Sequence, residues 1–311
     1  TWFQNAHEYR LTPWHNDPVS DPGGEAFYLR DEETGRYWSP TAGPARGSSP
    51  YVCRHGLGYT AFEHAQDGIS TEMMTYVATD APVKITSITV RNTTDRNRRL
   101  SLTGYCEWVL GELRARNAPH VVSRLDLQTG ALFATNAYVT EFAGTVAFFH
   151  ALGGPRSHTG DRLEFIGRNG SLGAPEALRR QKLSGAMGAG LDPCAALQVQ
   201  VELPAGQQRE ILFILGAAGS PEEARGLLRR FGSPAGARQA LESVWQFWKH
   251  LLGGIYVETP DESVNFLVNH WLLYQVLSSR FWGRGGLYQS GGAYGFRDQL
   301  QDSQIFLPLD P

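Results

Sequence analysis

Cysteine is scarce in this sequence, and long apolar runs are missing. The three cysteines, Cys53, Cys106 and Cys194, are too few and too widely spaced to predict a disulfide framework or a zinc site. We expect all three to be buried free thiols. No stretch approaches the ~18 uninterrupted apolar residues that a membrane-spanning helix requires. The sequence therefore predicts neither a metal site nor a membrane span in this chain.

A strong charge of either sign is also missing. The 311 residues carry 28 Lys and Arg against 31 Asp and Glu, a formal net charge of −3, and contain no basic run. This balance argues against nucleic acid or an anionic membrane surface as a partner. The polar start shows no signal peptide. Because the chain begins at Thr1 and not at a methionine, we expect residues to precede it.

What the chain does contain is a long series of short β patterns. Alternating or apolar runs between polar turns predict many strands in succession, which is typical of a large antiparallel sandwich. A segment at 168–192 has a weak helical or irregular pattern, and 153–160 has the composition of a loop. The predicted strands are 25–30, 36–38, 59–64, 69–78, 83–91, 98–108, 125–127, 131–136, 145–151, 197–203 and 210–215.

After residue 219 the pattern becomes helical. A Ser-Pro-Glu-Glu capping box predicts a helix at 220–231, and apolar residues at helical spacing predict another at 235–252. The motif Thr-Pro-Asp-Glu repeats the capping pattern and predicts a long helix at 259–280. That helix is apolar on more than one side, so we expect it to be buried in a larger helical assembly.

A glycine-rich segment at 282–295 precedes a cluster of polar side chains. Glycines at this density allow positive φ and close approach of the backbone. If the following residues are helical, Arg297, Asp298, Gln301 and Asp302 can share one face. A guanidinium, carboxylates and an amide suit a hydroxyl-rich ligand such as a sugar. A surface loop followed by a solvated helix start is an equally consistent interpretation.

Several of these motifs resemble those of one enzyme family. The C-terminal motif GGAYGFRDQLQD resembles the corresponding segment of the glycoside hydrolase family 94 phosphorylases. The N-terminal motifs NAHEYRLTPW from Asn5, FYLRDEETG from Phe27 and LTGYCEWVLG from Leu102 look like the N-terminal domain of the same family. The resemblance therefore covers essentially the whole chain. It is strongest to the branch of cyclic β-1,2-glucan synthases and β-1,2-oligoglucan phosphorylases.

This resemblance implies a fold in three parts. Residues 1–218 are expected to form a mainly β super-sandwich of the galactose mutarotase-like type. Residues 219–256 are expected to form linker helices, and 257–311 the beginning of an (α/α)6 barrel. On sequence pattern alone the helical domain is also unfinished, because a helix that is apolar on several sides needs further partners.

The resemblance also implies an activity. Family members cleave β-glucosides with inversion, using inorganic phosphate as co-substrate and releasing α-glucose 1-phosphate, without a further cofactor. By this match Arg297, Asp298, Gln301 and Asp302 hold the sugar at the −1 position, although Asp298 could instead support Arg297. The family's general acid lies in an Asp-Trp-Asn-Asp-like segment that this sequence lacks. We expect it beyond Pro311, so no catalytic residue is assigned.

The expected partners are a β-glucan oligosaccharide or disaccharide and phosphate, and the family includes homodimers. The expected location is the cytoplasm, or the cytoplasmic part of a larger membrane-bound synthase. Two alternatives remain: a non-catalytic carbohydrate-binding sandwich, and a hydrolase that uses water on the same fold. The weaker candidates are His7 and His55, which could line the rim of a cleft, Arg284, which could approach an anion, and Glu107, which resembles a glycosidase carboxylate. A structural or solvated role is at least as good an interpretation of each.

Overall fold

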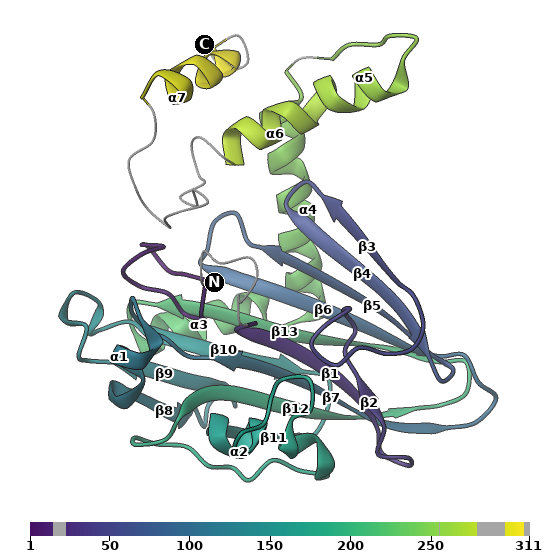
Figure 1. Ribbon diagram of the computed structural model, residues 1–311, viewed down its shortest axis with the longest axis vertical. Helices are drawn as coiled ribbons and strands as arrows, with labels where there is room; N and C mark the ends of the chain where they lie inside the picture. Colours follow the sequence, from purple (N-terminus) through teal and green to yellow (C-terminus); the bar gives the residue numbers. More distant parts are fainter. Residues whose placement is uncertain (15–22, 255, 279–295, 308–311) are drawn as a thin grey trace.

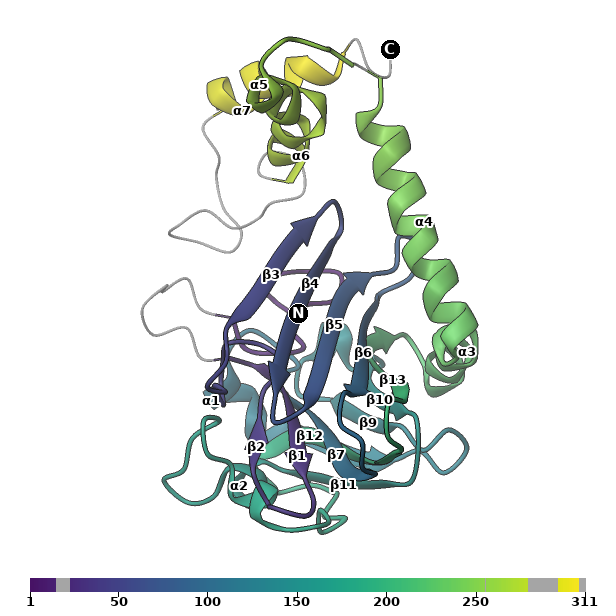
Figure 2. The same cartoon turned by 90° about the vertical axis from the view of Figure 1, so that its right-hand side faces the viewer.

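The computed structural model describes residues 1–14, 23–254, 256–278 and 296–307 (Figure 1). Two antiparallel sheets pack face to face, and helices extend from one end of this sandwich (Figure 2). The smaller sheet has the order β11 (Arg156–Asp161), β12 (Pro193–Leu203), β7 (Arg98–Glu107), β1 (Glu25–Asp31) and β2 (Tyr37–Trp38). The larger sheet has the order β3 (Tyr51–Gly56), β4 (Tyr59–Gln66), β5 (Ile69–Val77), β6 (Val83–Asn92), β13 (Gln208–Ala218), β10 (Val146–Leu152), β9 (Leu132–Asn136) and β8 (Val121–Leu125).

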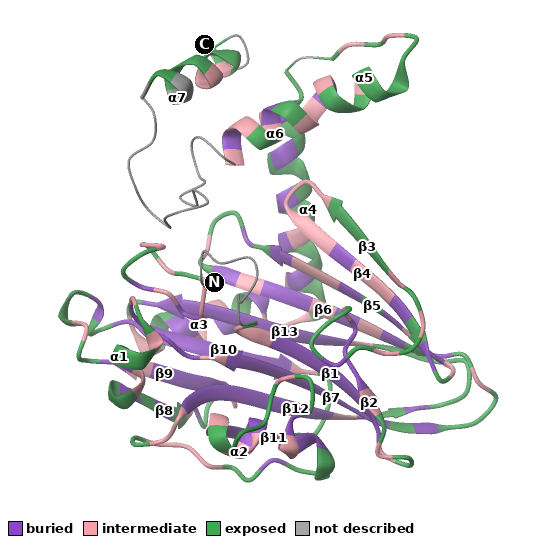
Figure 3. Cartoon of the chain, viewed as in Figure 1, coloured by how far each residue is buried: buried purple, intermediate pink, exposed green. Residues whose placement is uncertain are grey.

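The main core lies between the two sheets. Alternate residues of β7 and β13 point inward, so that Leu100, Leu102, Phe213 and Leu215 are all buried there. Burial is concentrated in these strands, whereas the last helices are largely exposed (Figure 3). The predicted antiparallel sandwich is therefore confirmed.

Three strands were predicted wrongly. β3 was missed and β11 was assigned to a loop, because both lie at sheet edges and carry mostly polar or exposed residues. β8 lies at Val121–Leu125, before the predicted 125–127. The edge position of β3 also explains a second error: Cys53 is exposed, whereas Cys106 and Cys194 are buried as predicted.

The irregular segment after β11 covers the outer face of the smaller sheet. It includes α2 (Arg162–Ile166) and the short 3-10 turn η3 (Glu176–Arg179). Phe165 and Leu178 pack on Tyr28 and Tyr105 of the sheet, and the rings of Tyr105 and Phe165 stack at 4.7 Å. This segment therefore forms a second, smaller core. The remaining short turns of the sandwich are α1 (Arg114–Asn117), η1 (Ala118–His120) and η2 (Thr140–Phe142).

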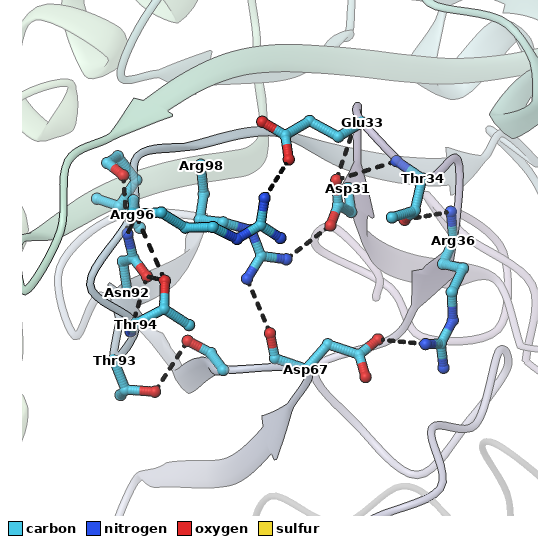
Figure 4. Close-up of polar contacts among 12 residues, drawn as sticks. Asp31, Glu33, Thr34, Arg36, Asp67, Asn92, Thr93, Thr94, Arg96 and Arg98 are labelled. Carbon is cyan, nitrogen blue, oxygen red and sulfur yellow. Dashed lines mark hydrogen bonds and ion pairs between the residues drawn. The ribbon is translucent and has the colours of Figure 1, made fainter.

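One end of the sandwich is held by a network of charged and polar side chains (Figure 4). Arg98 donates to the Asp31 carboxylate at 2.6 Å and to the backbone carbonyl of Asp67 at 2.8 Å, and both side chains of the Arg98–Asp31 pair are buried. Around this pair, Arg96 contacts Glu33 at 2.6 Å at the surface. The network joins β1, β7 and the turn between β4 and β5.

Helices α3 (Pro221–Phe231) and α4 (Pro234–Leu252) pack on the outer face of the larger sheet. Each begins with a serine cap followed by proline: Ser220 Oγ accepts from the Glu223 amide at 3.1 Å, and Ser233 Oγ accepts from the Gly236 amide at 3.0 Å. Tyr76 of β5 donates to the Ala237 carbonyl at 2.7 Å and joins the sheet to α4. Both predicted helices are confirmed.

The predicted long helix at 259–280 is interrupted. The chain forms α5 (Glu262–Phe266), a π-helical turn η4 (Leu267–Trp271) and α6 (Leu272–Val276), while 279–280 lie outside the described residues. The interruption is at Asn269, whose side chain bonds both the amide and the carbonyl of Val257 at 2.7 Å. The cap is Asp261 and not Thr259. Phe266 is 68% exposed, and the burial of this helix in a larger helical assembly stays a prediction.

The last described elements are α7 (Phe296–Ser303) and η6 (Gln304–Phe306), at the helical end of the molecule (Figures 1 and 2). Phe306 packs against the apolar cluster beneath α3, α4 and α6. Within the described ranges no helix is both long and apolar enough to cross a membrane. The same residues include no group of three or more His, Cys, Asp or Glu side chains placed to hold a metal ion.

Candidate functional site

The residues predicted to bind sugar lie on a helix, as the spacing argument requires. All four belong to α7, where Arg297 and Gln301 are one turn apart, as are Asp298 and Asp302. Arg297 and Gln301 are exposed and Asp302 is half-buried. The Asp298 side chain and the glycine-rich segment at 282–295 lie outside the described part of the chain. Their joint role in binding sugar stays a prediction.

The chemistry of the described α7 side chains suits a polar ligand. A guanidinium offers several fixed donors, which match paired hydroxyls or phosphate oxygens. A carboxylate such as Asp302 accepts from hydroxyls, and the Gln301 amide can do both. α7 lies at the helical end of the molecule, away from the sandwich (Figure 1).

A second candidate site, which we call the aromatic cleft, lies between the sandwich and the helices. Its volume is about 820 Å³. The β3–β4 hairpin and β5 form one wall, and α4 with the η4–α6 segment forms the other. The lining residues are His55, Gly56, Gly58, Tyr59, Thr60, Thr75, Tyr76, Val77, Ala78, Thr79, Val244, Phe247, Trp248, Trp271 and Tyr274.

The helical wall of this cleft is built from aromatic rings. Trp271 and Tyr274, one turn apart, are stacked with centroids 5.7 Å apart and planes 18° apart. Trp248 of α4 lies 4.7 Å from Tyr274, which joins the two helical segments. On the opposite side, the hairpin turn at Gly58 packs directly on Trp248. Trp248 itself is buried in the cluster of apolar residues between α4 and the larger sheet, and Tyr274 packs against that cluster.

His55 lies at this cleft, as the sequence suggested for a rim. Its Nδ1 is 3.1 Å from Thr60 Oγ1, and its Nε2 is 3.3 Å from Cys53 Sγ. Both ring nitrogens thus have polar neighbours, which fix the orientation of the imidazole. This agrees with the interpretation of His55 as a polar structural residue that also lines the cleft.

Glu107 has a structural environment. Its carboxylate accepts from Arg162 Nε at 2.7 Å and from the Tyr105 hydroxyl at 3.0 Å, and it forms an ion pair with Arg114 at 2.7 Å. Asp192 lies 3.3 Å from Arg162 and completes a cluster of two cations and two anions. Glu107 thus links β7 to Arg114 of α1 and to Arg162 of α2. The opposite charges of the cluster compensate each other, which indicates a structural role.

Sequence analysis did not find the aromatic cleft. The sequence showed only apolar residues at helical spacing in 235–252 and in 259–280. The cleft combines four segments that are far apart in the chain, so no local pattern describes it. The available signal was the repeated spacing of three residues between aromatic residues on successive helices.

Two family models match this sequence. The model described as glycosyl hydrolase 94, supersandwich domain, matches residues 1–234. The model described as glycosyl hydrolase 94 superfamily, catalytic domain, matches residues 247–311. The predicted domain boundaries at residues 218 and 256 stay predictions, as does the closure of the helices into an (α/α)6 barrel.

The relatives include a synthase and several phosphorylases. The cyclic beta-(1,2)-glucan synthase NdvB of Rhizobium meliloti (strain 1021) is 41% identical over 99% of this chain. The N,N'-diacetylchitobiose phosphorylase of Vibrio proteolyticus is 26% identical over 97% of the chain, and the solabiose phosphorylase of Paenibacillus borealis is 29% identical over 92%. The chain spans only 11% of the synthase, 39% of the first phosphorylase and 37% of the second.

A solved structure shares the fold. A bacterial glucoamylase complexed with acarbose matches with a TM-score of 0.53 and 9% identity, over 90% of this chain and 41% of that one. This likeness agrees with the observed order of a β sandwich followed by helices. Because the supersandwich model alone matches most of the sequence, the chain belongs to the glycosyl hydrolase 94 family.

Proposed function

We propose that this chain is part of an inverting glycoside phosphorylase that acts on β-glucosides, with β-1,2-linked glucan oligosaccharides as the preferred class. The observation that carries the proposal is the 41% identity to a cyclic beta-(1,2)-glucan synthase over 99% of the chain, together with the match to the family's catalytic domain. The phosphorylases among the relatives supply the reaction type.

In the proposed reaction an oxygen of inorganic phosphate attacks the anomeric carbon from the face opposite the glycosidic oxygen. The bond from that carbon to the glycosidic oxygen breaks, and a carboxylic acid gives its proton to the leaving oxygen. The products are α-glucose 1-phosphate and a glucan shortened by one unit. No general base is required, because phosphate is already an anion. The acid is not assigned to a residue of this chain.

The role that we propose for α7 is to hold the sugar that is being cleaved. Arg297 donates to hydroxyls of this sugar, and Asp302 and Gln301 accept from or donate to the neighbouring ones. Asp298 either joins them or supports Arg297. Fixing the ring in this way places its anomeric carbon for attack, which is a large part of what such enzymes contribute to rate.

Two other functions remain as alternatives. A hydrolase on the same fold would transfer the glucosyl unit to water, and a binding module would hold sugar without turnover. The number of phosphorylases among the relatives favours the first proposal over both. The cytoplasmic location and the homodimer stay predictions.

The test is an assay on the protein expressed from its full reading frame. We expect glucose 1-phosphate to form from β-1,2-linked glucose oligosaccharides only when phosphate is added. Arg297→Ala should lower kcat/KM at least 100-fold, because a charged, multidentate contact to the reacting sugar is lost. Arg297→Lys should restore little of it, because lysine lacks the planar fork.

Arg179→Ala is a matched control, since Arg179 is an exposed arginine on the outer layer of the sandwich. It should leave kcat/KM within twofold of the original protein. Sugar release that is independent of phosphate would support the hydrolase. Full activity of the Arg297→Ala variant would contradict the assignment of α7.

A further inference from the structure

Cys53 differs from the other two cysteines of the chain in its surroundings. Cys106 of β7 and Cys194 of β12 are fully buried, and burial raises the pKa of both thiols well above the ordinary value. Cys53 is exposed on β3, an edge strand that is exposed along most of its length (Figure 3). A thiol acts as a nucleophile where reagents reach it and its proton can leave. Cys53 is therefore the thiol of the three that a reagent in solution can reach.

The position of Cys53 on the strand places an imidazole beside the thiol. Residues two apart on a strand point to the same face, and Cys53 Sγ lies 3.3 Å from His55 Nε2. The intervening Arg54 points to the other face, where it forms an ion pair with Glu63 of β4. The guanidinium is thus engaged on the far side of the sheet, and the thiol makes its hydrogen-bonding contact with His55.

A third residue determines which nitrogen of His55 offers its lone pair to the thiol. Thr60 of β4 is opposite His55 in the strand pairing, and its Oγ1 lies 3.1 Å from His55 Nδ1. When Thr60 accepts a hydrogen bond from Nδ1–H, Nε2 carries no proton and accepts from the Cys53 thiol. A nucleophile, a base and a group that orients the base thus lie in one row, which is the arrangement that activates thiols in enzymes.

The other cysteines of the chain are not placed to form a disulfide with Cys53. Cys106 and Cys194 belong to strands of the smaller sheet, whereas Cys53 lies at the edge of the larger one, and all three are free thiols. The second sulfur of a disulfide at Cys53 must therefore come from another molecule. A small disulfide can approach this side chain, because no further strand lies beyond β3 in its sheet.

We propose that Cys53 is a modification site that forms mixed disulfides with small disulfides, with His55 as the base and Thr60 as its positioning residue. The Cys53 sulfur attacks one sulfur of the small disulfide, and the thiol proton passes to His55 Nε2. The S–S bond of the reagent breaks as the new S–S bond forms. The departing sulfur leaves with the electron pair and takes the proton from His55. One thiol and one disulfide are consumed and one of each is formed, so no oxidant is needed.

This reaction is independent of the proposed phosphorolysis. All three residues lie in the part of the chain that matches the supersandwich model, and none belongs to α7. Modification of Cys53 in a protein without phosphorylase activity would keep this inference and refute the proposed function. Phosphorolysis by a protein whose Cys53 does not react would do the reverse.

The experiment incubates the folded protein, expressed from its full reading frame, with oxidised glutathione at neutral pH and follows each cysteine by peptide mass spectrometry. Trypsin separates the three thiols, because Cys53, Cys106 and Cys194 fall in the peptides 47–54, 100–114 and 183–209. We expect the peptide 47–54 to gain one glutathionyl group, which dithiothreitol removes, while the other two peptides stay unmodified. Absence of modification at Cys53, or equal modification of a buried cysteine, would overturn the proposal.

Two substitutions test the neighbours of the thiol. His55→Gln keeps a polar side chain but removes the base, and it should lower the rate constant of Cys53 modification at least ~10-fold. Thr60→Val keeps the branched shape but removes the acceptor of Nδ1–H, and it should lower the rate constant roughly threefold. His120→Gln is the matched control, since His120 is exposed and its ring stacks on Tyr138 at 4.0 Å. It should leave the rate constant within ~2-fold.

Added imidazole separates a base from a merely structural residue. In His55→Ala the space beside Cys53 is open, so imidazole from solution can take the proton and should speed the reaction by a larger factor than in the original protein. Circular dichroism and the unfolding midpoint show whether each variant is folded. A folded His55→Gln variant that reacts as fast as the original protein, or a folded His55→Ala variant that imidazole does not speed, would overturn the role of His55. The comparison of the three peptides uses the original protein and tests the site without any variant.

Discussion

At the scale of the residue, buried ionisable groups in the sandwich make its stability depend on pH. His150 of β10 is buried, and its Nδ1 accepts from Arg156 Nη1 at 3.2 Å. Burial and the nearby Arg156 cation lower the pKa of His150 from its ordinary value of 6.5 to about 4. The folded protein therefore keeps this imidazole neutral under conditions in which the unfolded chain protonates it.

The sign of the resulting pH dependence follows from linkage. The pKa of His150 is lower in the folded protein than in the unfolded chain, so above pH ~6.5 the imidazole is neutral in both states and costs no stability. As the pH falls from ~6.5 to about 4, only the unfolded chain is protonated, and the free energy of unfolding decreases by on the order of 3 kcal/mol. His150→Gln removes the titration and should reduce the loss by that amount. Urea unfolding at pH 7, 5.5 and 4.5 measures it.

The comparison between the two proteins is what matters, because carboxylates also titrate below pH 5. If the original chain and His150→Gln lose the same stability between pH 7 and 4.5, the buried neutral imidazole is not the cause. His120 offers a control, since it is exposed and stacks on Tyr138 at the surface. His120→Gln should leave the pH profile unchanged.

The Arg98–Asp31 pair tests the network at the end of the sandwich (Figure 4). Arg98→Met leaves the Asp31 carboxylate buried without its cation and should lower the free energy of unfolding by ~3–5 kcal/mol. Arg96→Met breaks the exposed pair with Glu33 and should lower it by less than ~1 kcal/mol. Denaturant unfolding at pH 7 compares them.

The double variant Arg98→Met with Asp31→Asn should recover part of the loss, because no uncompensated charge is then buried. Equal effects of Arg98→Met and Arg96→Met would show that burial does not govern this network.

At the scale of the element, the bounds of helices and strands were predicted most accurately where contacts within one turn of the chain determine them. The cap predicted at Ser220 acts within one turn, and its helix begins there. The second helix was predicted from apolar spacing alone, and its cap at Ser233 starts it one residue before the predicted 235. Edge strands β3 and β11 were missed because edges need no apolar alternation. The break at Asn269 was missed because its side chain bonds Val257, twelve residues away.

The two candidate sites differ in the same respect: one could be predicted from local spacing and the other could not. The helical spacing of the α7 residues could be read from the sequence, since it depends only on i, i+3 and i+4 neighbours. The aromatic cleft could not, because it exists only when the β3–β4 hairpin and α4 come together. The contact at Gly58, which holds the hairpin to α4, is a tertiary feature.

The contact at Gly58 predicts how much stability is lost when the β3–β4 hairpin is pushed away from α4. Gly58 has φ of +78°, and an added Cβ would overlap Trp248 and Val244 of α4. Gly206 has φ of +70° but has open space around it. Gly206→Ala should therefore lower the free energy of unfolding by ~1–2 kcal/mol from backbone strain alone. Gly58→Ala should lower it by a further ~1–3 kcal/mol from overpacking.

Chemical denaturation of both variants measures this difference, and tryptophan fluorescence reports on the surroundings of Trp248. We expect an altered emission only for Gly58→Ala. Equal stability of the two variants would mean that the hairpin tip can move away from α4 without loss.

At the scale of the whole molecule, a large sandwich supports a smaller group of helices. Two helices, α3 and α4, pack on one sheet, and Figure 2 shows that α4 continues beyond it. There Trp248 of α4 contacts Tyr274 of α6, with ring centroids 4.7 Å apart. The bond from the Tyr76 hydroxyl to the Ala237 carbonyl ties the start of α4 to the sandwich.

The central claim is phosphorolysis of a β-glucoside with inversion, and the most direct measurement is phosphorus NMR of the reaction. The protein from the full reading frame is incubated with a β-1,2-linked glucose oligosaccharide and inorganic phosphate. Phosphorus NMR detects the sugar phosphate formed first, and the H1–H2 coupling constant in the proton spectrum identifies its anomer. The account predicts α-glucose 1-phosphate, appearing as the oligosaccharide shortens. The β anomer, or free glucose with no sugar phosphate, would contradict it.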